Sequence, residues 1–551
     1  MLIVAFTTFC IATTYSRPSS EGSAEREVGK MLIQPGSEDT IENRERVKEL
    51  YGSIRIKNMQ LRRGGRKNTG KYFYMGPKCN VTTQDIPQLN DDIKEWLYEG
   101  DMALTVPQAT SILTGKQTSD RPVRSLQTDP SGYWPTSVAI NYTFSPTLSN
   151  RTVKLIRTAV QFWHDNTCLS FTENPDGINR LRFTNGSGCW SYVGRQKSWT
   201  SQDISIGTGC ENFGIVTHEI GHAIGFYHTQ SRYDRDDYIT IEMDNIAESM
   251  QYNFRKLTNL TENHFGHKYD YGSVMQYDPY AFAMNPDLYT IVAKDVLYMN
   301  AMGQRDAPSF SDVRMINELY NCSSNCASQP KPDCLPPGYP DPRDCLRDLP
   351  QGTAPGCSGE VVKAVDDWRN LTGVAGDPND WSALRTAFDC YWHIMAPPGR
   401  QVQYYLTLAP SVCMESCPWQ SIEINAGEFD LYGMVLCCPS TVGVLMTSEG
   451  NLVTIRGALK YNQLKFDIKY RILPFEPTTD IPTPGHTPDY VKMSSTTTTA
   501  GYVPPPVKVS STTRPETTTT AGYVPHSAVE TSVGHNSLEA TEQPSEELGR
   551  Y

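Results

Sequence analysis

Residues 218–228 have the sequence HEIGHAIGFYH, which brings three histidines, His218, His222 and His228, into one short stretch. Positions i and i+4 of a helix lie on one face about one turn apart, so the imidazoles of His218 and His222 can meet a single metal ion. Gly225 allows the chain to leave the helix with a positive φ, and that turn brings His228 round as a third ligand. The stretch therefore predicts a helix that ends in a three-histidine metal site.

Three neutral nitrogens leave the fourth position of a zinc ion to water, which is the arrangement of a catalytic rather than a structural zinc site. Zinc lowers the pKa of its bound water from 15.7 to about 7. Glu219 follows the first ligand and can accept a hydrogen bond from that water, so it is the predicted general base. With only 10 histidines in 551 residues, unrelated surface histidines rarely produce this spacing. One catalytic Zn²⁺ per subunit is the predicted cofactor.

The composition limits the partners of the chain. It carries 49 basic against 61 acidic side chains, a net charge of -12, which argues against a nucleic-acid binder and against a protein held by anionic membranes. A length of 551 residues supports three or four domains. Fifteen cysteines suit a disulfide-bonded protein of an oxidising compartment.

The N-terminus predicts secretion. The apolar run Leu2–Ala12 is too short to span a bilayer, and small and polar residues follow it. We interpret residues 1–16 as a signal peptide, with an N-terminal core strand as the alternative. No later stretch reaches the about 18 apolar residues of a membrane helix, so no transmembrane segment is expected. Seven N-x-S/T sequons are candidate glycosylation sites of a secreted, extracellular protein: Asn80, Asn141, Asn150, Asn185, Asn259, Asn321 and Asn370.

The segment before the metal site is polar and charge-rich. Over residues 17–124, here called the front segment, the low apolar content predicts weak order. It ends in Arg121–Arg124, an R-x-x-R spacing that suits a basic-residue processing protease, although an ordinary exposed loop has the same composition. Strand-like sequence follows at once, so we expect activation cleavage after Arg124 by another protease.

Residues 125–322 have the pattern of a mixed α/β domain, with a helix over 152–164 and strands near 181–183 and 203–206. Residues 323–358 are rich in cysteine and poor in apolar residues, so disulfides must replace a core there. Alternating patterns over 359–475 predict an all-β sandwich. Residues 476–551 are rich in Thr, Ser and Pro and predict a disordered tail, either a mucin-like stalk with O-glycans or unmodified.

Sequence around the histidines resembles a known family. The motifs are Ser231-Arg232-Tyr233-Asp234-Arg235-Asp236, Gly188-Cys189-Trp190-Ser191-Tyr192-Val193-Gly194-Arg195 and Ser273-Val274-Met275-Gln276-Tyr277. Together with the zinc stretch they resemble the astacin metalloproteases of the metzincin clan over essentially all of 125–322. The resemblance implies a two-lobed α/β domain, whose active-site cleft lies between a twisted sheet and the zinc helix.

The resemblance also implies roles for particular residues. Met275 of the Met-turn would form an apolar floor beneath the zinc, and Tyr277 would lie near the zinc and hydrogen-bond the transition-state oxyanion. Two disulfides are implied, Cys168–Cys322 and Cys189–Cys210. In the front segment, Tyr98-Glu99-Gly100-Asp101 resembles the F-x-G-D of astacin propeptides, so the Asp101 carboxylate would take the position of the catalytic water on zinc in the zymogen.

Downstream, residues 323–358 resemble an epidermal-growth-factor-like module, and residues 359–475, with Cys390 and Cys437-Cys438, resemble the CUB domain of nematode astacins. This domain order is that of the subgroup linked to hatching and cuticle remodelling. A CUB domain would bind substrate or matrix.

Three departures from the family pattern stand out. Thr229 replaces the usual Glu after the third ligand, and Gln276 replaces the usual His of the Met-turn. The growth-factor-like module lacks two of six cysteines, which suggests that Cys334 and Cys357 pair. The accessory modules hold nine cysteines, so one thiol would be free or paired between chains.

Two functions remain open at this point. The first is a secreted, zymogen-activated zinc metalloendopeptidase that hydrolyses extracellular proteins, with cuticle or egg-shell matrix as candidate substrates. The alternative is a catalytically silent adhesion or binding protein that acts through its CUB domain, which Thr229 favours.

Overall fold

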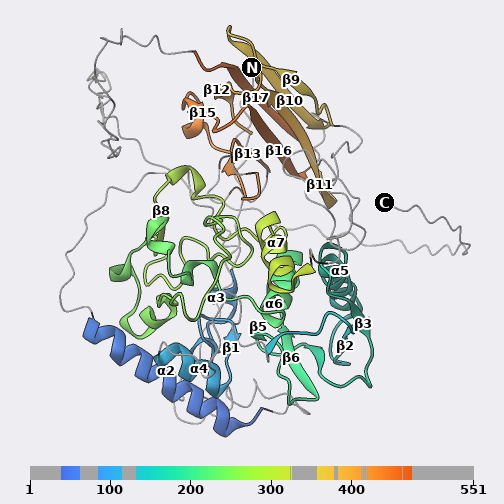
Figure 1. Cartoon of the computed structure of the whole chain (residues 1–551), viewed down its shortest axis with the longest axis vertical. Helices are drawn as coiled ribbons and strands as arrows, with labels where there is room; N and C mark the ends of the chain where they lie inside the picture. Colours follow the sequence, from blue (N-terminus) through green and yellow to red (C-terminus); the bar gives the residue numbers. More distant parts are fainter. Residues whose placement is uncertain are drawn as a thin grey trace, which may run out of the picture. The chain divides into compact units, whose positions relative to one another are not determined.

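The computed structural model describes residues 39–61, 85–114, 132–322, 324, 357–377, 382–410, 413, 417, 420–427, 429–461 and 463–474. Figure 1 shows the whole chain. The predicted signal peptide, the processing site at Arg124, Asn80, most of the growth-factor-like module and the Thr-rich tail lie outside the described residues. Among the described residues, no helix combines the length and apolar character needed to cross a membrane.

The structure of residues 132–322, here called the catalytic region after its predicted role, is built on a six-stranded sheet with the order β1-β5-β6-β4-β2-β3, to which the front segment contributes β1. Its strands are β1 (Met102–Ala103), β2 (Ile140–Phe144), β3 (Phe171–Glu173), β4 (Arg180–Thr184), β5 (Cys189–Tyr192) and β6 (Ser201–Ile206). Strands β2, β3, β4 and β6 run parallel, whereas β5 is antiparallel to β6. The predicted strands at 181–183 and 203–206 lie within β4 and β6 and are confirmed.

Helix α5 (Asn150–Asn166) covers this sheet and confirms the helix predicted over 152–164. It begins at Ser149, whose hydroxyl accepts a hydrogen bond from the backbone N–H of Thr152 at 3.1 Å, an ordinary N-cap. Its apolar face, which includes Ile156 and Trp163, is fully buried in the core of this lobe. Burial of that face, rather than helix propensity, supplies most of the stability of such a helix.

The remainder of the catalytic region contains little regular structure. It holds helix α6 (Phe213–Ala223), the two-stranded sheet of β7 (Ile239–Ile241) and β8 (Ile291–Ala293), and α7 (Phe310–Leu319). Short 3₁₀ helices connect them: η3 (Thr229–Ser231), η4 (Arg235–Asp237), η5 (Met243–Asn245), η6 (Glu248–Phe254) and η7 (Val296–Tyr298). Ser309 and Asp312 form a capping box that fixes the start of α7.

The front segment is more ordered than its composition suggests. It contains α2 (Ile41–Leu61), α3 (Ile86–Leu89), η1 (Lys94–Trp96), β1 and α4 (Val106–Thr114). Val47 and Tyr51 of α2 are 1% exposed, within the same apolar cluster as catalytic-region residues such as Tyr252. The prediction of weak order was therefore wrong for 39–61 and 85–114, because these residues bury their few apolar side chains against the catalytic region instead of against one another.

The described residues between 357 and 474 form the predicted β-sandwich, which is confirmed. One sheet has the order β10-β17-β12-β15 and the other β14-β13-β16-β11-β9. The strands are β9 (Val361–Lys363), β10 (Arg369–Gly376), β11 (Ala383–Met395), β12 (Val402–Leu408), β13 (Gln420–Asn425), β14 (Met434–Leu436), β15 (Met446–Thr447), β16 (Leu452–Tyr461) and β17 (Gln463–Ile472), with η9 at Pro439–Thr441. Alternating residues of β17 are buried, as expected for a strand with one face on a core.

Five disulfides lie within the described residues: Cys168–Cys322, Cys189–Cys210, Cys357–Cys390, Cys413–Cys438 and Cys417–Cys437. The suggested Cys334–Cys357 pair is wrong, because Cys357 is bonded to Cys390 of β11 and so belongs to the sandwich. Spacing alone could not find this partner, since the sandwich brings together cysteines from two regions of different composition. Cys10, Cys79, Cys326, Cys334 and Cys345 lie outside the described residues.

Candidate metal centre

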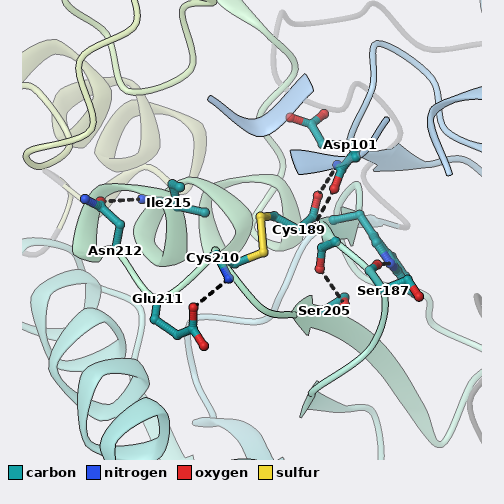
Figure 2. Close-up of a disulfide and its surroundings, with 12 residues drawn as sticks. Asp101, Ser187, Cys189, Ser205, Cys210, Glu211, Asn212 and Ile215 are labelled. Atoms are coloured by element: carbon teal, nitrogen blue, oxygen red, sulfur yellow. Dashed lines mark hydrogen bonds between the residues drawn. A yellow bond between two sulfur atoms is a disulfide. The ribbon is translucent and has the colours of Figure 1, made fainter. Parts of the chain in front are cut away.

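Helix α6 carries the first two histidines and is held at both ends. At its start, the Asn212 side chain accepts hydrogen bonds from the backbone N–H groups of Gly214 and Ile215, at 2.8 and 3.3 Å. Figure 2 shows this cap beside the Cys189–Cys210 disulfide, which ties β5 to the loop before α6. Cap and disulfide together fix the helix against the edge of the sheet.

The turn that ends α6 positions the third histidine. Gly225 has φ +124°, a conformation that side-chain-bearing residues rarely adopt, and the chain turns there as predicted. His218 and His222 are completely buried, and His228 is 2% exposed. All three imidazoles face one point, at which the Asp101 carboxylate of the front segment also arrives.

The distances among these four groups are those of a single coordination sphere. Nε2 of His218 and Nε2 of His228 are 3.3 Å apart. Asp101 Oδ2 lies 3.2 Å from His218 Nε2 and 3.1 Å from His228 Nε2, and Asp101 Oδ1 lies 3.5 Å from His222 Nε2. Bonds of 2.0–2.1 Å at tetrahedral angles would separate neighbouring zinc ligands by roughly 3.3–3.4 Å. The site therefore has the size of a four-coordinate zinc site.

The protonation of the rings explains why a cation belongs there. His218 Nδ1 lies 2.7 Å from the carbonyl oxygen of Val274, and His222 Nδ1 lies 2.8 Å from that of Phe226. A carbonyl oxygen can only accept, so each Nδ1 carries the proton and each Nε2 directs a lone pair inward. Among the described residues, His222 Nε2 and Asp101 Oδ1 have no hydrogen-bond partner. Lone pairs of this kind repel one another unless a cation lies between them, and zinc fits this donor set.

Glu219 follows the first histidine on helix α6. It is completely buried, and neither of its carboxylate oxygens has a hydrogen-bond partner within the described part of the chain. Burial raises the pKa of Glu219 well above its ordinary value, and the negative charge of Asp101 raises it further. A buried carboxylate with a raised pKa is a better proton acceptor than an exposed one, as a general base requires.

The Met-turn residues lie on the other side of the imidazoles. Met275 is 1% exposed and packs against α6, since a Cβ placed on Gly221 would lie 3.2 Å from its Sδ. The ring of Tyr277 is 4.6 Å from that of His228, and its hydroxyl donates to the backbone carbonyl of Glu99. Gln276 accepts a hydrogen bond from the Tyr269 hydroxyl and does not join the metal ligands.

The front segment packs directly against these residues. Strand β1 pairs in parallel with β5, at the edge of the sheet, and Ser191 N–H donates to the Asp101 carbonyl at 3.1 Å. Gly100 has φ +81°, and an added Cβ would lie 2.9 Å from the ring of Phe282, so only glycine permits this close passage. Burial would raise the pKa of Asp101, but the facing imidazoles, His228 first, hold it well below its ordinary value.

The Thr229 side chain is hydrogen-bonded to another buried side chain of the catalytic region. Its hydroxyl donates to Ser273 Oγ at 2.9 Å, and Ser273 Oγ donates to Asp312 at 2.6 Å. Thr229 therefore connects the end of the zinc stretch to α7 and leaves the metal ligands untouched.

Three residues at or near the site were not predicted from the sequence. Glu99 lies 2.9 Å from His228 Nδ1. Asp85 of the front segment forms a bidentate ion pair with Arg305, at 2.8 and 2.9 Å. The Y-E-G-D motif pointed to the neighbourhood of Glu99, but nothing local pointed to Asp85 or Arg305.

A buried three-histidine centre, with a buried carboxylate next to the first histidine and a methionine packed against the same helix, has the arrangement of a zinc metalloprotease. Comparison with known proteins narrows this class. Residues 126–321 match the family model described as astacin (peptidase family M12A).

Relatives extend beyond the catalytic region. The chain is 41% identical over 474 residues to zinc metalloproteinase nas-28 of Caenorhabditis elegans, covering 82% of this chain and 95% of that protein. It is 33% identical over 428 residues to zinc metalloproteinase dpy-31 of Brugia malayi, covering 72% of this chain and 68% of the relative. Among solved structures, high choriolytic enzyme 1, a hatching enzyme zinc-protease from the medaka fish Oryzias latipes, is 32% identical and covers 36% of this chain and 99% of its own, with a TM-score of 0.33. The chain belongs to the astacin family, and zinc is the cofactor of its metal centre.

Proposed function

We propose that this chain is the latent precursor of a secreted zinc endopeptidase that hydrolyses peptide bonds of extracellular proteins. The proposed order is a signal peptide (1–16), a propeptide (17–124), the protease (125–322), a growth-factor-like module (323–358), a CUB domain (359–475) and a Thr/Ser/Pro-rich tail (476–551). The observation that carries the proposal is the convergence of three histidine Nε2 atoms on one point, beside a buried Glu219 that lacks a hydrogen-bond partner among the described residues.

The catalytic step follows from this geometry. The three histidines would hold a zinc ion, which would supply an electrophile for the scissile carbonyl and lower the pKa of a water. Glu219 takes a proton from the attacking water as the new C–O bond forms, and gives it to the amine nitrogen as the C–N bond breaks. Tyr277, once freed from the front segment, donates its hydroxyl to the developing oxyanion. His218, His222 and His228 hold the metal throughout.

Substrate would bind where the front segment now lies. Removal of β1 exposes the backbone groups of β5, an unpaired sheet edge on which an extended peptide can form a further strand. Removal of Asp85 also leaves the Arg305 guanidinium without its carboxylate. Arg305 donates a hydrogen bond to the Val274 carbonyl, which also faces His218 Nδ1, so its guanidinium lies beside the metal centre. We therefore propose that the mature enzyme favours an acidic substrate residue near the cut.

Latency and activation belong to the same proposal. Asp101 holds the position at which water would otherwise react, and an activating protease would cut after Arg124. The mature chain would then begin at Ser125.

The proposed setting is extracellular. Five disulfides in the described residues suit an oxidising compartment. The sequon residues Asn150, Asn185, Asn259, Asn321 and Asn370 are exposed, whereas Asn141 is half-buried and its side chain is hydrogen-bonded to Asn174. Cuticle or egg-shell matrix is the proposed substrate, in hatching or moulting, with the CUB domain as a binding site for substrate or matrix.

The central test replaces the base. Glu219→Gln should retain one zinc per chain, because Glu219 is not a ligand, and should lose peptide cleavage after processing. Glu248→Gln, at an exposed position of the same region, is the matched control and should cleave like the parent. N-terminal sequencing and cleavage profiling of the processed parent give the activation site and the preference. A parent that is processed and zinc-loaded yet inactive would instead support the adhesion function.

A further inference from the structure

The three zinc-ligand histidines have unequal outer partners. His218 Nδ1 and His222 Nδ1 each face a backbone carbonyl of the catalytic region, at 2.7 and 2.8 Å. His228 Nδ1 instead faces a carboxylate oxygen of Glu99, at 2.9 Å. The first two partners remain after activation, whereas Glu99 leaves with the front segment.

Glu99 is built into this position. It is completely buried, and it has φ +49°, a conformation that costs energy in a residue with a side chain and persists only when its contacts fix it. Its second carboxylate oxygen accepts a hydrogen bond from Ser231 Oγ at 2.6 Å. Its backbone N–H donates to the Asn253 side chain at 3.0 Å, and its carbonyl accepts from Tyr277.

We propose that Glu99 is a second latch residue, separate from Asp101, whose carboxylate strengthens the hold of His228 on zinc in the precursor alone. This inference rests on the proposed function of a latent zinc protease. A carboxylate that accepts from Nδ1–H makes the imidazole a more basic ligand, and a full negative charge does so more strongly than a carbonyl dipole. Loss of such an outer partner typically costs 10- to 100-fold in metal affinity.

Glu99 also engages the second catalytic group. Its carbonyl holds the Tyr277 hydroxyl, so the residue that would stabilise the oxyanion is occupied while the front segment is in place. Asp101 blocks the reacting position, and Glu99 positions the two side chains around it. Activation therefore frees Tyr277 and loosens the metal in the same event.

The test measures zinc release from the full-length precursor. An Arg124→Ala background prevents processing after Arg124, and 4-(2-pyridylazo)resorcinol reports the released zinc. Glu99→Gln, which keeps the shape and removes the charge, and Glu99→Ala should both release zinc faster, by 10- to 100-fold for Glu99→Ala. Asp91→Asn removes an exposed carboxylate of the same segment, which pairs with Lys94 and does not touch the histidines, and it should release zinc at the parent rate.

A second variant tests the same contact from the catalytic side. Ser231→Ala removes the hydrogen bond that orients Glu99, so it should speed zinc release severalfold in the precursor and leave the processed enzyme unchanged. This variant carries the test if the Glu99 variants are not secreted. Parent-like release from Glu99→Ala, equal acceleration by Asp91→Asn, or the same effect of Ser231→Ala in both forms would each overturn the inference. A parent that binds no zinc would refute the proposed function itself.

Discussion

A hydrogen bond from Tyr192 of β5 helps to hold the start of α2, and with it the front segment, in place. Its hydroxyl donates to the Asp39 carboxylate at 2.7 Å, and Asp39 also forms an ion pair with Arg44. The Arg44 guanidinium lies 5.2 Å from the centre of the Tyr192 ring and donates to the Leu104 carbonyl at 2.7 Å. All three side chains are buried. Burial raises the pKa of Tyr192 well above its ordinary value, so the hydroxyl stays a donor at any working pH.

Tyr192→Phe removes this donor and leaves the ring. A hydrogen bond to a charged group contributes about 1.5–3 kcal/mol when both partners are buried. At 1.36 kcal/mol for each factor of ten, the equilibrium for opening of α2 should shift by roughly 10- to 150-fold. Amide hydrogen exchange of residues 41–51 in the precursor measures that equilibrium directly.

The expected result is faster exchange in α2 by this factor, with α5 unchanged. Tyr233→Phe, at a tyrosine that is 40% exposed on the same domain, is the control and should exchange like the parent. The processed enzyme lacks Asp39, so its thermal stability should not change with Tyr192→Phe. Unchanged exchange in α2 would refute the idea that this buried cluster anchors the front segment.

Three further predictions concern Asp101, Arg305 and Asp312. Asp101→Ala should give the uncleaved precursor measurable peptidase activity, and a silent variant would show that other contacts block the cleft. Arg305→Gln should reduce kcat/KM for peptides with an acidic residue next to the cut by about tenfold or more, with little change for neutral peptides, because it removes one charge-assisted contact of about 1.5–3 kcal/mol. Burial, with a smaller contribution from Asp270, raises the pKa of Asp312 to about 6. Because the folded state binds this proton more tightly than the unfolded state, the contribution to stability is complete below about pH 4 and is lost as pH rises through 6. The free energy of unfolding should therefore fall by about 3 kcal/mol over this range. Asp312→Asn should flatten this dependence of stability on pH.

Local sequence predicted the catalytic helix well, because the signals are short-range. His218 and His222 are one turn apart and Gly225 turns the chain, all within a span that the backbone alone can organise. The β-sandwich was predictable for a related reason, since alternation along β17 reflects one buried face.

Order in the front segment was not predictable from its own composition. Residues 39–61 cannot bury a core by themselves, and their order depends on a surface that the catalytic region supplies. Helix α2 has no continuous apolar face, but Val47 and Tyr51 are buried against that surface. The disulfide of Cys357 follows the same logic, because its partner is presented by a strand of a different module.

The sequence by itself determined where the three histidines and the neighbouring carboxylate lie along the chain, since His218, His222, His228 and Glu219 are specified by spacing along one helix and one turn. Only the tertiary structure decided what surrounds them. Glu99 reaches His228 across 129 positions of chain, and Asp85 reaches Arg305 across 220. Contacts over such separations exist only after both regions have folded around a common core, because each closed loop must be compensated by burial elsewhere. The ligands are therefore encoded locally, whereas the outer partners that control them are products of the fold.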